Sequence, residues 1–255
     1  MKNDMPLSEY DATVPALIEP TKVIGAIPDF PEHVVMCFFQ DAIASLRDEF
    51  QAEVIAKTSS EIGDNLIYRF IYNEKPIAVM HAGVGAPLSG SFLEELIAKG
   101  GKKFIACGGA GVLDSTIGIG HVVVPNAAIR DEGTSYHYLP ASRDALAHPQ
   151  AVDACISALD AAGVPHIVGK TWTTDGIYRE TPQKIKQRRA EGALVVEMET
   201  AAFFAIAQFR EVIFGQLLYG GDDVGAEVWN HRDWDRQHSL REKLLHLAMD
   251  AVIRL

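Results

Sequence analysis

The sequence predicts an α/β fold in which helices flank a mixed, mostly parallel central β-sheet. Short apolar runs bounded by glycine or proline alternate with longer segments that carry apolar residues at helical spacing. Such alternation is typical of a sheet whose strands are joined by helices. No Ser/Gly-rich linker or low-complexity stretch divides the 255 residues, and one domain can fill that length. We therefore expect a single domain over residues 1–255, with an irregular N-terminal extension over residues 1–32.

Eight apolar runs predict the strands. Two of them, LIYRFIYN and PIAVMHA, are expected to form a hairpin around Asn73 and Glu74, which makes the sheet mixed. KFIACGGAG is expected to open into a glycine loop, and VIFGQLLYGGDD into an acidic loop. The full set covers residues 33–39, 66–73, 76–82, 103–111, 121–128, 166–175, 194–196 and 212–223.

Six segments predict helices. LSGSFLEELIAKG ends on glycine, a common helix stop, and TPQKIKQRRAEG carries proline in its first turn, where proline is tolerated. The predicted helices cover residues 40–50, 88–100, 149–163, 181–192, 197–209 and 238–255.

The composition excludes several classes of partner. A net charge of −11, spread along the chain, argues against a nucleic-acid backbone as a partner. No apolar run reaches the roughly 20 residues of a membrane span, and the first twenty residues carry acids where a signal peptide needs basic and apolar regions. Three cysteines without a CxxC motif favour a reducing compartment. We expect a cytoplasmic protein.

Ligands of α/β folds bind beyond the carboxyl ends of the strands, and the glycine-rich segments lie there. Gly83 and Gly85 precede a predicted helix, and Gly108 and Gly109 follow a predicted strand. Glycines let backbone approach a ligand, and a helix N-terminus favours an anion. Structural turns explain the same glycines equally well. Neither segment is GxGxxG and no Walker lysine follows, so a dinucleotide or nucleoside triphosphate is not expected.

Carboxylates are the strongest candidates for catalysis. LVVEMETAAFFAI places Glu197 and Glu199 around Met198 on a buried run, and Asp222 and Asp223 end the next strand. Two carboxylates can bind vicinal hydroxyls, and a third with a raised pKa can donate a proton. Favourable placement at a helix N-terminus explains one acid of the Glu-Met-Glu run, but less easily both.

Other kinds of site are less well supported. AIRDEGTSYHYLP (128–140), which includes His137, mixes aromatic and hydrogen-bonding groups that suit a sugar or base, although a solvated loop is the alternative. No HExxH, GxSxG or tight His/Asp cluster occurs, so neither a metal nor a serine nucleophile is expected. The run WNHRDWDRQH (229–238) reads as a lid or as a surface turn.

With these residues the chain resembles the nucleoside phosphorylase/nucleosidase superfamily, of the purine nucleoside and uridine phosphorylase type. The resemblance covers roughly residues 33–250 and rests on HAGVGAPLSGSFLEELIAKGGKKFIACGGAG, HVVVPNAAIRDEGTSYHY, WTTDGIYRETPQKI and the Glu-Met-Glu run. It implies cleavage of a nucleoside's N-glycosidic bond through an oxocarbenium-like transition state. It implies no cofactor, with inorganic phosphate as co-substrate, and a homo-oligomer, either a dimer or a hexamer.

The resemblance also implies roles for individual residues. Glu199 would bind the ribose 2′ and 3′ hydroxyls, Met198 would pack against the sugar, and Glu197 would support the site. Asp222 would be the general acid that protonates a purine at N7. Asp223 would either raise the pKa of Asp222 or be a solvated neighbour. Tyr178 and Arg179 would contact the base or line the pocket, which leaves purine and uridine both open.

The arginines that hold phosphate in the family are missing at the corresponding positions. The family's Gly-Asp-Pro-x-Arg motif is replaced by CFFQDA, its Arg before the second glycine loop by Ala106, and the loop's Ser or Thr by Gly109. The arginine that a neighbouring subunit supplies would fall near Gly63. Three arginines are left as possible substitutes, Arg69, Arg130 and Arg179.

These departures keep two other functions open. In nucleosidases of the superfamily, water attacks in place of phosphate, and Asp41 stands about where their water-activating carboxylate would be. An aspartate stabilised by a helix N-terminus is the ordinary explanation of Asp41. The third possibility is a non-catalytic nucleoside-binding protein that kept the ribose acids and lost the phosphate site.

Overall fold

The computed structural model describes residues 5–255. The strands are β1 (His33–Cys37), β2 (Glu53–Ser60), β3 (Gly63–Tyr72), β4 (Lys75–His81), β5 (Lys103–Val112), β6 (Val122–Asp131), β7 (Asp144–Leu146), β8 (His166–Thr174), β9 (Ala193–Glu197) and β10 (Ile213–Asp223). The helices are α1 (Pro20–Val23), α2 (Gln40–Glu49), α3 (Ala86–Lys99), α4 (Pro149–Ala161), α5 (Pro182–Ala190), α6 (Thr200–Phe209) and α7 (His238–Val252). The expected α/β fold with a mixed central sheet is confirmed.

One sheet contains all these strands and closes partly on itself. Its order is β10-β6-β8-β9-β5-β1-β4-β3-β2, β7 pairs with β6, and β10 also pairs with β5. The two longest central pairings, β5–β10 and β6–β8, are parallel, whereas the antiparallel contacts β10–β6 and β5–β9 involve two residue pairs each. The extra pairing joins β10, β6, β8, β9 and β5 into a ring, which strand patterns along the sequence did not reveal.

The predicted hairpin is present as β3 and β4. Asn73 and Glu74 form its turn with φ of 45° and 65°, the left-handed conformation that a two-residue hairpin turn requires. The hairpin extends to a third strand, β2, that the sequence analysis missed. Only Thr58 of β2 is buried, because β2 lies at the edge of the sheet, and its one apolar run covers just residues 54–56.

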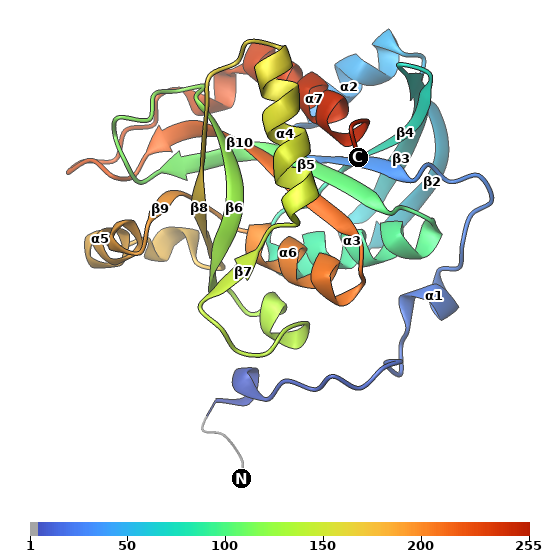
Figure 1. Ribbon diagram of the computed structural model, residues 1–255, viewed down its shortest axis with the longest axis horizontal. Coiled ribbons are helices and arrows are strands. Elements are labelled where there is room, and N and C mark those ends of the chain that lie inside the picture. Colours follow the sequence, from blue (N-terminus) through green and yellow to red (C-terminus); the bar gives the residue numbers. More distant parts are fainter. Residues whose placement is uncertain (1–4) are drawn as a thin grey trace.

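Two helical layers enclose the sheet (Figure 1). Helices α2, α4 and α7 cover one face together with a core that includes Val35, Leu217 and Met249. Helices α3 and α6 cover the other face, where Phe92 and Phe203 pack. These layers bury the strands on both sides, which explains their nearly continuous apolar runs.

The expected glycine loop at residues 108–111 is wrong, because these glycines lie inside β5 and pair with β10. A Cβ at Gly108 would come within 2.8 Å of Phe38, and one at Gly109 within 3.1 Å of Tyr219. The glycines therefore let aromatic rings lie against the strand.

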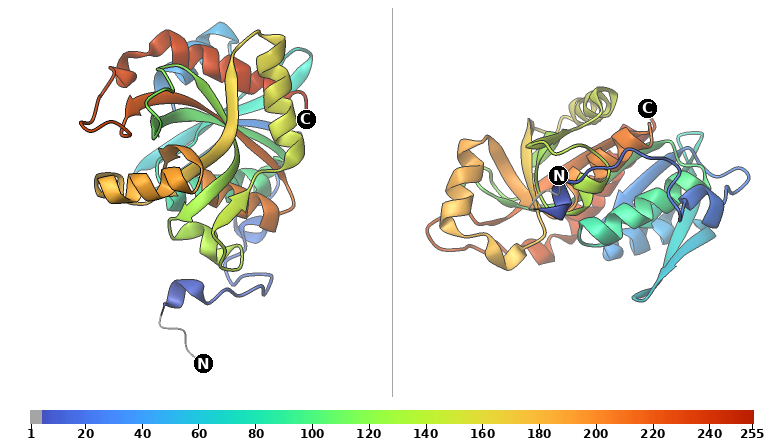
Figure 2. Two further views of the ribbon diagram at one scale, coloured as in Figure 1. Left: turned by 60° about the vertical axis from the view of Figure 1, so that its left-hand side comes forward. Right: turned by 90° about the horizontal axis from the view of Figure 1, so that it is seen from below.

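The segment before β1 lies mostly outside these layers (Figure 2). It contains a turn of 3-10 helix (Pro6–Ser8) and the short α1, and exposes Val14, Leu17 and Ile18. Among the helices of residues 5–255, none has the length and apolar character to cross a membrane.

Candidate active site

A cavity of about 550 Å³ lies at the carboxyl ends of β1, β5, β9 and β10. Its walls combine aromatic side chains with five carboxylates. The lining residues that bear on its chemistry are Phe39, Asp41, Gly109, Glu180, Glu197, Met198, Glu199, Asp222, Trp229, Trp234 and Arg241. Because the Glu-Met-Glu run, Asp41 and Asp222 all line this one cavity, three distant chain segments meet there.

Glu197 ends β9 and fastens the junction to α6. Its carboxylate accepts hydrogen bonds from Thr173 Oγ1 at 2.6 Å, from the backbone N–H of Glu199 at 2.7 Å and from that of Thr200 at 2.6 Å. Thr171 Oγ1 adds a longer bond at 3.2 Å. A buried carboxylate with this many donors stabilises the turn and fixes its neighbour Glu199.

Glu199 is the N-cap residue of α6 and is buried. The backbone N–H of Gly85 donates to its Oε1 at 2.6 Å, and that of Met198 to Oε2 at 3.3 Å. Gly85 is the N-cap of α3 with φ of 87°, which favours glycine. The predicted glycine turn thus positions Glu199 through the N–H group of Gly85. In the same turn, Val84 lines the cavity, whereas Gly83 does not.

Burial and the nearby Glu197 carboxylate raise the pKa of Glu199 to about 8. Burial also raises the pKa of Glu197, although its four hydrogen-bond donors oppose that rise. Because donors to a carboxylate favour its charged form, we assign the charge of the pair to Glu197. Glu199 therefore holds its proton more tightly than an ordinary glutamate does.

Asp222 faces a carboxylate that the sequence analysis missed. Trp229 Nε1 donates to Asp222 Oδ2 at 2.7 Å. Glu180 lies on the same cavity wall, and burial, reinforced by the negative charge of Asp222, raises its pKa to about 7. Within the described chain no hydrogen bond or ion pair to the Glu180 side chain is found. The run WTTDGIYRE contained Glu180, but nothing in the sequence indicated which of its side chains enters the cavity.

Asp223 is not the solvated neighbour that was one of the two roles expected for it. It is buried, outside the cavity lining, and accepts bonds from Arg232 Nη2 at 2.6 Å and from the N–H groups of Gly225 and Ala226 at 3.0 and 3.1 Å. These contacts anchor the loop after β10, so Asp223 is structural.

Asp41 lies in the first turn of α2, at another part of the cavity wall. His238 Nδ1 lies 2.5 Å from Asp41 Oδ2, and Arg241 Nη1 lies 3.6 Å from the same oxygen. Burial acts to raise the pKa of Asp41, but the hydrogen bond from His238 and the other contacts lower it below its usual value. Asp41 is therefore ionised at neutral pH and accepts a hydrogen bond from His238.

Several predicted binding residues do not line the cavity. Tyr178 and Arg179 belong to a short 3-10 helix (Ile177–Arg179), and Tyr178 is 94% exposed. Their neighbours Ile177 and Glu180 line the cavity instead. His137 is exposed in another 3-10 helix (Thr134–His137), and Gly108 packs under Phe38.

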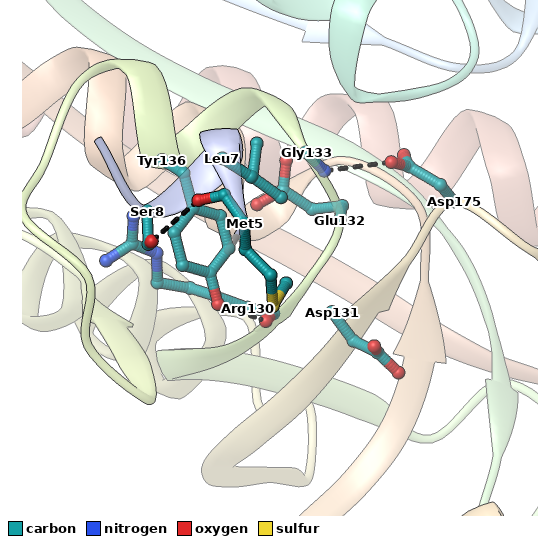
Figure 3. A pocket seen from close by; sticks show the side chains of 9 residues that line it. All are labelled: Met5, Leu7, Ser8, Arg130, Asp131, Glu132, Gly133, Tyr136 and Asp175. Carbon is teal, nitrogen blue, oxygen red and sulfur yellow. Dashed lines mark hydrogen bonds between the residues drawn. The ribbon is translucent and has the colours of Figure 1, made fainter. Parts of the chain in front are cut away.

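Two of the arginines considered for phosphate are engaged elsewhere. Arg130 donates to Ser135 Oγ at 2.8 Å and to Pro140 O and Ser142 Oγ at 2.7 Å. It borders a second cavity of about 380 Å³, next to the N-terminal segment with Met5 and Leu7 (Figure 3). Arg69 pairs with Glu53 at 2.9 Å on the edge of the sheet. The arginine in the main cavity is Arg241, which no local motif distinguishes from other charged residues of an amphipathic helix.

Fold and site together define an α/β protein with a carboxylate-lined cavity at the carboxyl ends of its strands. The family model described as "Phosphorylase superfamily" matches residues 32–254. The chain belongs to this superfamily, which confirms the family resemblance read from the sequence.

Relatives and solved structures agree with this assignment. The chain is 27% identical over 241 residues to a guanosine phosphorylase of Halorubrum lacusprofundi, covering 91% of this chain and 93% of the relative. It is 32% identical over 188 residues to a uridine phosphorylase of Treponema pallidum, covering 67% and 73%. A uridine phosphorylase structure from Vibrio fischeri superposes with a TM-score of 0.73 at 22% identity, covering 89% of this chain and 92% of that one. An AMP nucleosidase structure from Bacteroides thetaiotaomicron superposes with a TM-score of 0.70 at 22% identity, covering 88% of each. The two structures share the fold.

Proposed function

We propose that this protein is a nucleoside phosphorylase, an enzyme of pentosyltransferase type. It would cleave the N-glycosidic bond of a purine nucleoside or of uridine with phosphate, giving ribose 1-phosphate and the free base. Family membership and the phosphorylase relatives support this reaction. The observation that carries it is the Glu197-Met198-Glu199 junction, whose two buried carboxylates line a cavity of nucleoside size.

The junction suits the ribose. Glu199 is held by two backbone N–H groups, and its carboxylate accepts hydrogen bonds from the 2′ and 3′ hydroxyls once it loses its proton. Met198 provides an apolar contact for the sugar ring. Such preorganised contacts stabilise the positive charge that develops on the sugar in the transition state.

The departing base needs a proton, and Asp222 is the general acid that donates it. A neutral base leaves more readily than its anion. Burial and the negative charge of Asp222 raise the pKa of Glu180 to about 7, so Glu180 can hold a proton at this cavity wall and supply it to Asp222 for transfer to the base. The aromatic rings of Trp229 and Trp234 offer flat apolar surfaces for the base.

The decisive experiment measures base release from guanosine, inosine, adenosine and uridine in matched buffers with and without phosphate. We expect base release to require phosphate and to produce ribose 1-phosphate in equal amount. Base release at an unchanged rate without phosphate, with free ribose as product, would exclude the phosphorylase.

Hydrolysis is the second candidate, because an ionised Asp41 paired with His238 lines the same cavity. A nucleosidase would use Asp41 to activate water. Asp41→Asn would then abolish phosphate-independent base release, and turnover equal to that of the unchanged protein would exclude this role. A protein that only binds nucleosides would bind guanosine or uridine without releasing a base under either condition.

We also propose a cytoplasmic homo-oligomer, a dimer or hexamer. Its support is the family resemblance, the free cysteines Cys37, Cys107 and Cys155, and apolar side chains exposed on the β2–β3 hairpin, among them Ile62 and Ile71. Light scattering coupled to gel filtration tests the assembly, and a monomer at micromolar concentration contradicts it.

A further inference from the structure

The cavity contains one cation whose hydrogen-bonding capacity is largely unused within the described chain. Arg241 enters from the first turn of α7, with its side chain only 13% exposed. Its guanidinium carbon lies 5.2 Å from the ring centre of Phe39 and 5.8 Å from that of Trp234. Two aromatic rings thus hold a planar charged group in a fixed orientation.

Most of the five N–H donors of Arg241 lack a good acceptor. Nε is shielded from solvent and has no partner in residues 5–255. Nη2 makes one long bond, 3.4 Å, to Trp234 O, and Nη1 is 3.6 Å from Asp41 Oδ2, which is too far for a hydrogen bond. The Tyr219 hydroxyl donates to Trp234 O at 3.0 Å and also accepts from the guanidinium, which leaves three of the five donors, Nε among them, without a good acceptor. A shielded guanidinium with spare donors is suited to bind an oxyanion.

The charges of the cavity lining point to the same ligand. Its other ionisable side chains are carboxylates, and these suit the hydroxyls of a sugar and the edge of a base. A phosphate dianion in such a cavity needs a positive charge, since an unpaired buried charge is costly. Arg241 supplies it among the described residues that line the cavity, whereas Ala106 and Gly63 occupy the positions where family arginines were expected.

Asp41 makes the site next to Arg241 selective among oxyanions. Its carboxylate is ionised and already accepts a hydrogen bond from His238, and Oδ2 lies 3.6 Å from Arg241 Nη1. An oxyanion that is bound to Arg241 therefore has a carboxylate for a neighbour. Phosphate and arsenate keep a hydroxyl at neutral pH and can donate it to Asp41, but sulfate has no proton to donate and would place two acceptors face to face.

We propose that Arg241 and Asp41 form the phosphate subsite, in which Arg241 provides the charge and Asp41 accepts the P–OH hydrogen bond and rejects sulfate. The subsite takes hydroxyl-bearing tetrahedral oxyanions. It replaces the missing family arginines with one from the C-terminal helix. This inference rests on the proposed phosphorolytic reaction and assigns Asp41 to phosphate in place of water.

The first test compares Arg241→Met and Arg241→Lys with Arg236→Met, an exposed neighbouring arginine outside the cavity lining that changes net charge equally. We expect the KM for phosphate to rise at least tenfold in Arg241→Met and less in Arg241→Lys, while the KM for the nucleoside stays within about threefold. Arg236→Met should leave both constants unchanged. Phosphate-dependent turnover with an unaltered phosphate KM in Arg241→Met overturns the inference but leaves the phosphorylase intact.

The second test needs only binding and applies even where an Arg241 variant is unstable. Thermal shifts are measured with inorganic phosphate, arsenate and sulfate on the unchanged protein and on Asp41→Asn. We expect phosphate and arsenate, but not sulfate, to raise the melting temperature of the unchanged protein. Asp41→Asn should gain a response to sulfate, because an amide can donate to it. Equal responses to phosphate and sulfate in the unchanged protein contradict the role of Asp41. Phosphate-independent base release instead removes the proposed function itself.

Discussion

Replacing Glu180 with glutamine removes a carboxyl group whose ionised form destabilises the folded protein. In the folded protein, burial and the charge of Asp222 raise the pKa of Glu180 from 4.5 to about 7. Because the folded pKa lies above the unfolded one, the folded state holds the proton more tightly. The contribution of Glu180 to stability is therefore most favourable below about pH 4.5 and declines as the pH rises towards 7.

The size of the effect follows from the shift. A change of about 2.5 pKa units corresponds to roughly 3.4 kcal/mol at about 1.4 kcal/mol per unit. Glu180 is only half-buried, so solvent screening reduces this value, and we expect about 1–2 kcal/mol. Between pH 4.5 and 8.5, Glu180→Gln should gain that much unfolding free energy relative to the unchanged protein.

Urea unfolding at fixed protein concentration, repeated across this pH range, measures the difference. Other carboxylates with raised pKa values, such as Glu199, are present in both proteins, so their contributions largely cancel. Glu61→Gln, at an exposed turn beside β2, is the control and should leave the pH dependence unchanged. Parallel curves for Glu180→Gln and the unchanged protein would refute the reasoning.

The remaining predictions concern the other carboxylates of the cavity. Glu199→Gln should lose about 2–4 kcal/mol of transition-state stabilisation, measured as a fall in kcat/KM, as for the loss of one preorganised polar contact. Near-native kinetics with a 2′,3′-dihydroxy nucleoside would contradict its ribose role. Glu197→Ala should destabilise the fold by about 2–4 kcal/mol, because it leaves the buried N–H groups of Glu199 and Thr200 without their acceptor; an unchanged urea midpoint would contradict this. Asp222→Asn should slow cleavage of guanosine or inosine by about 10²–10⁴-fold, yet barely affect 7-methylguanosine, whose base leaves without protonation. Equal losses on both substrates would exclude Asp222 as the general acid.

Much of the fold could be predicted because the buried strands have apolar sequences. The central strands are covered by helices on both faces, so their apolar runs are continuous, as in VVMC of β1 and IAVM of β4. The apolar run of edge strand β2 covers just residues 54–56, and β7 has three residues. The pairing of β10 with both β5 and β6 depends on contacts between distant segments, which periodicity along the chain does not encode.

Some residues of the candidate site could likewise be predicted from the sequence, and others could not. Glu197 and Glu199 could be found because two acids within a buried run contradict its apolar character, and their hydrogen bonds at a strand–helix junction explain the exception. Tyr178 and Arg179 looked equally suitable for a ligand, but they are exposed, whereas their neighbour Glu180 faces the cavity. Within a short 3-10 turn, side-chain direction depends on packing that the sequence does not display.

By itself, the sequence determined the α/β fold, the phosphorylase superfamily and the acidic junction at residues 197–199. The tertiary structure decided which charges share the cavity. It brings Glu180 against Asp222 and carries Arg241 from the last helix to Asp41, about 200 residues away along the chain. The physical reason is that hydrophobic burial is recorded locally, in periodic patterns, whereas the pairing of charges depends on where the folded strands and helices end.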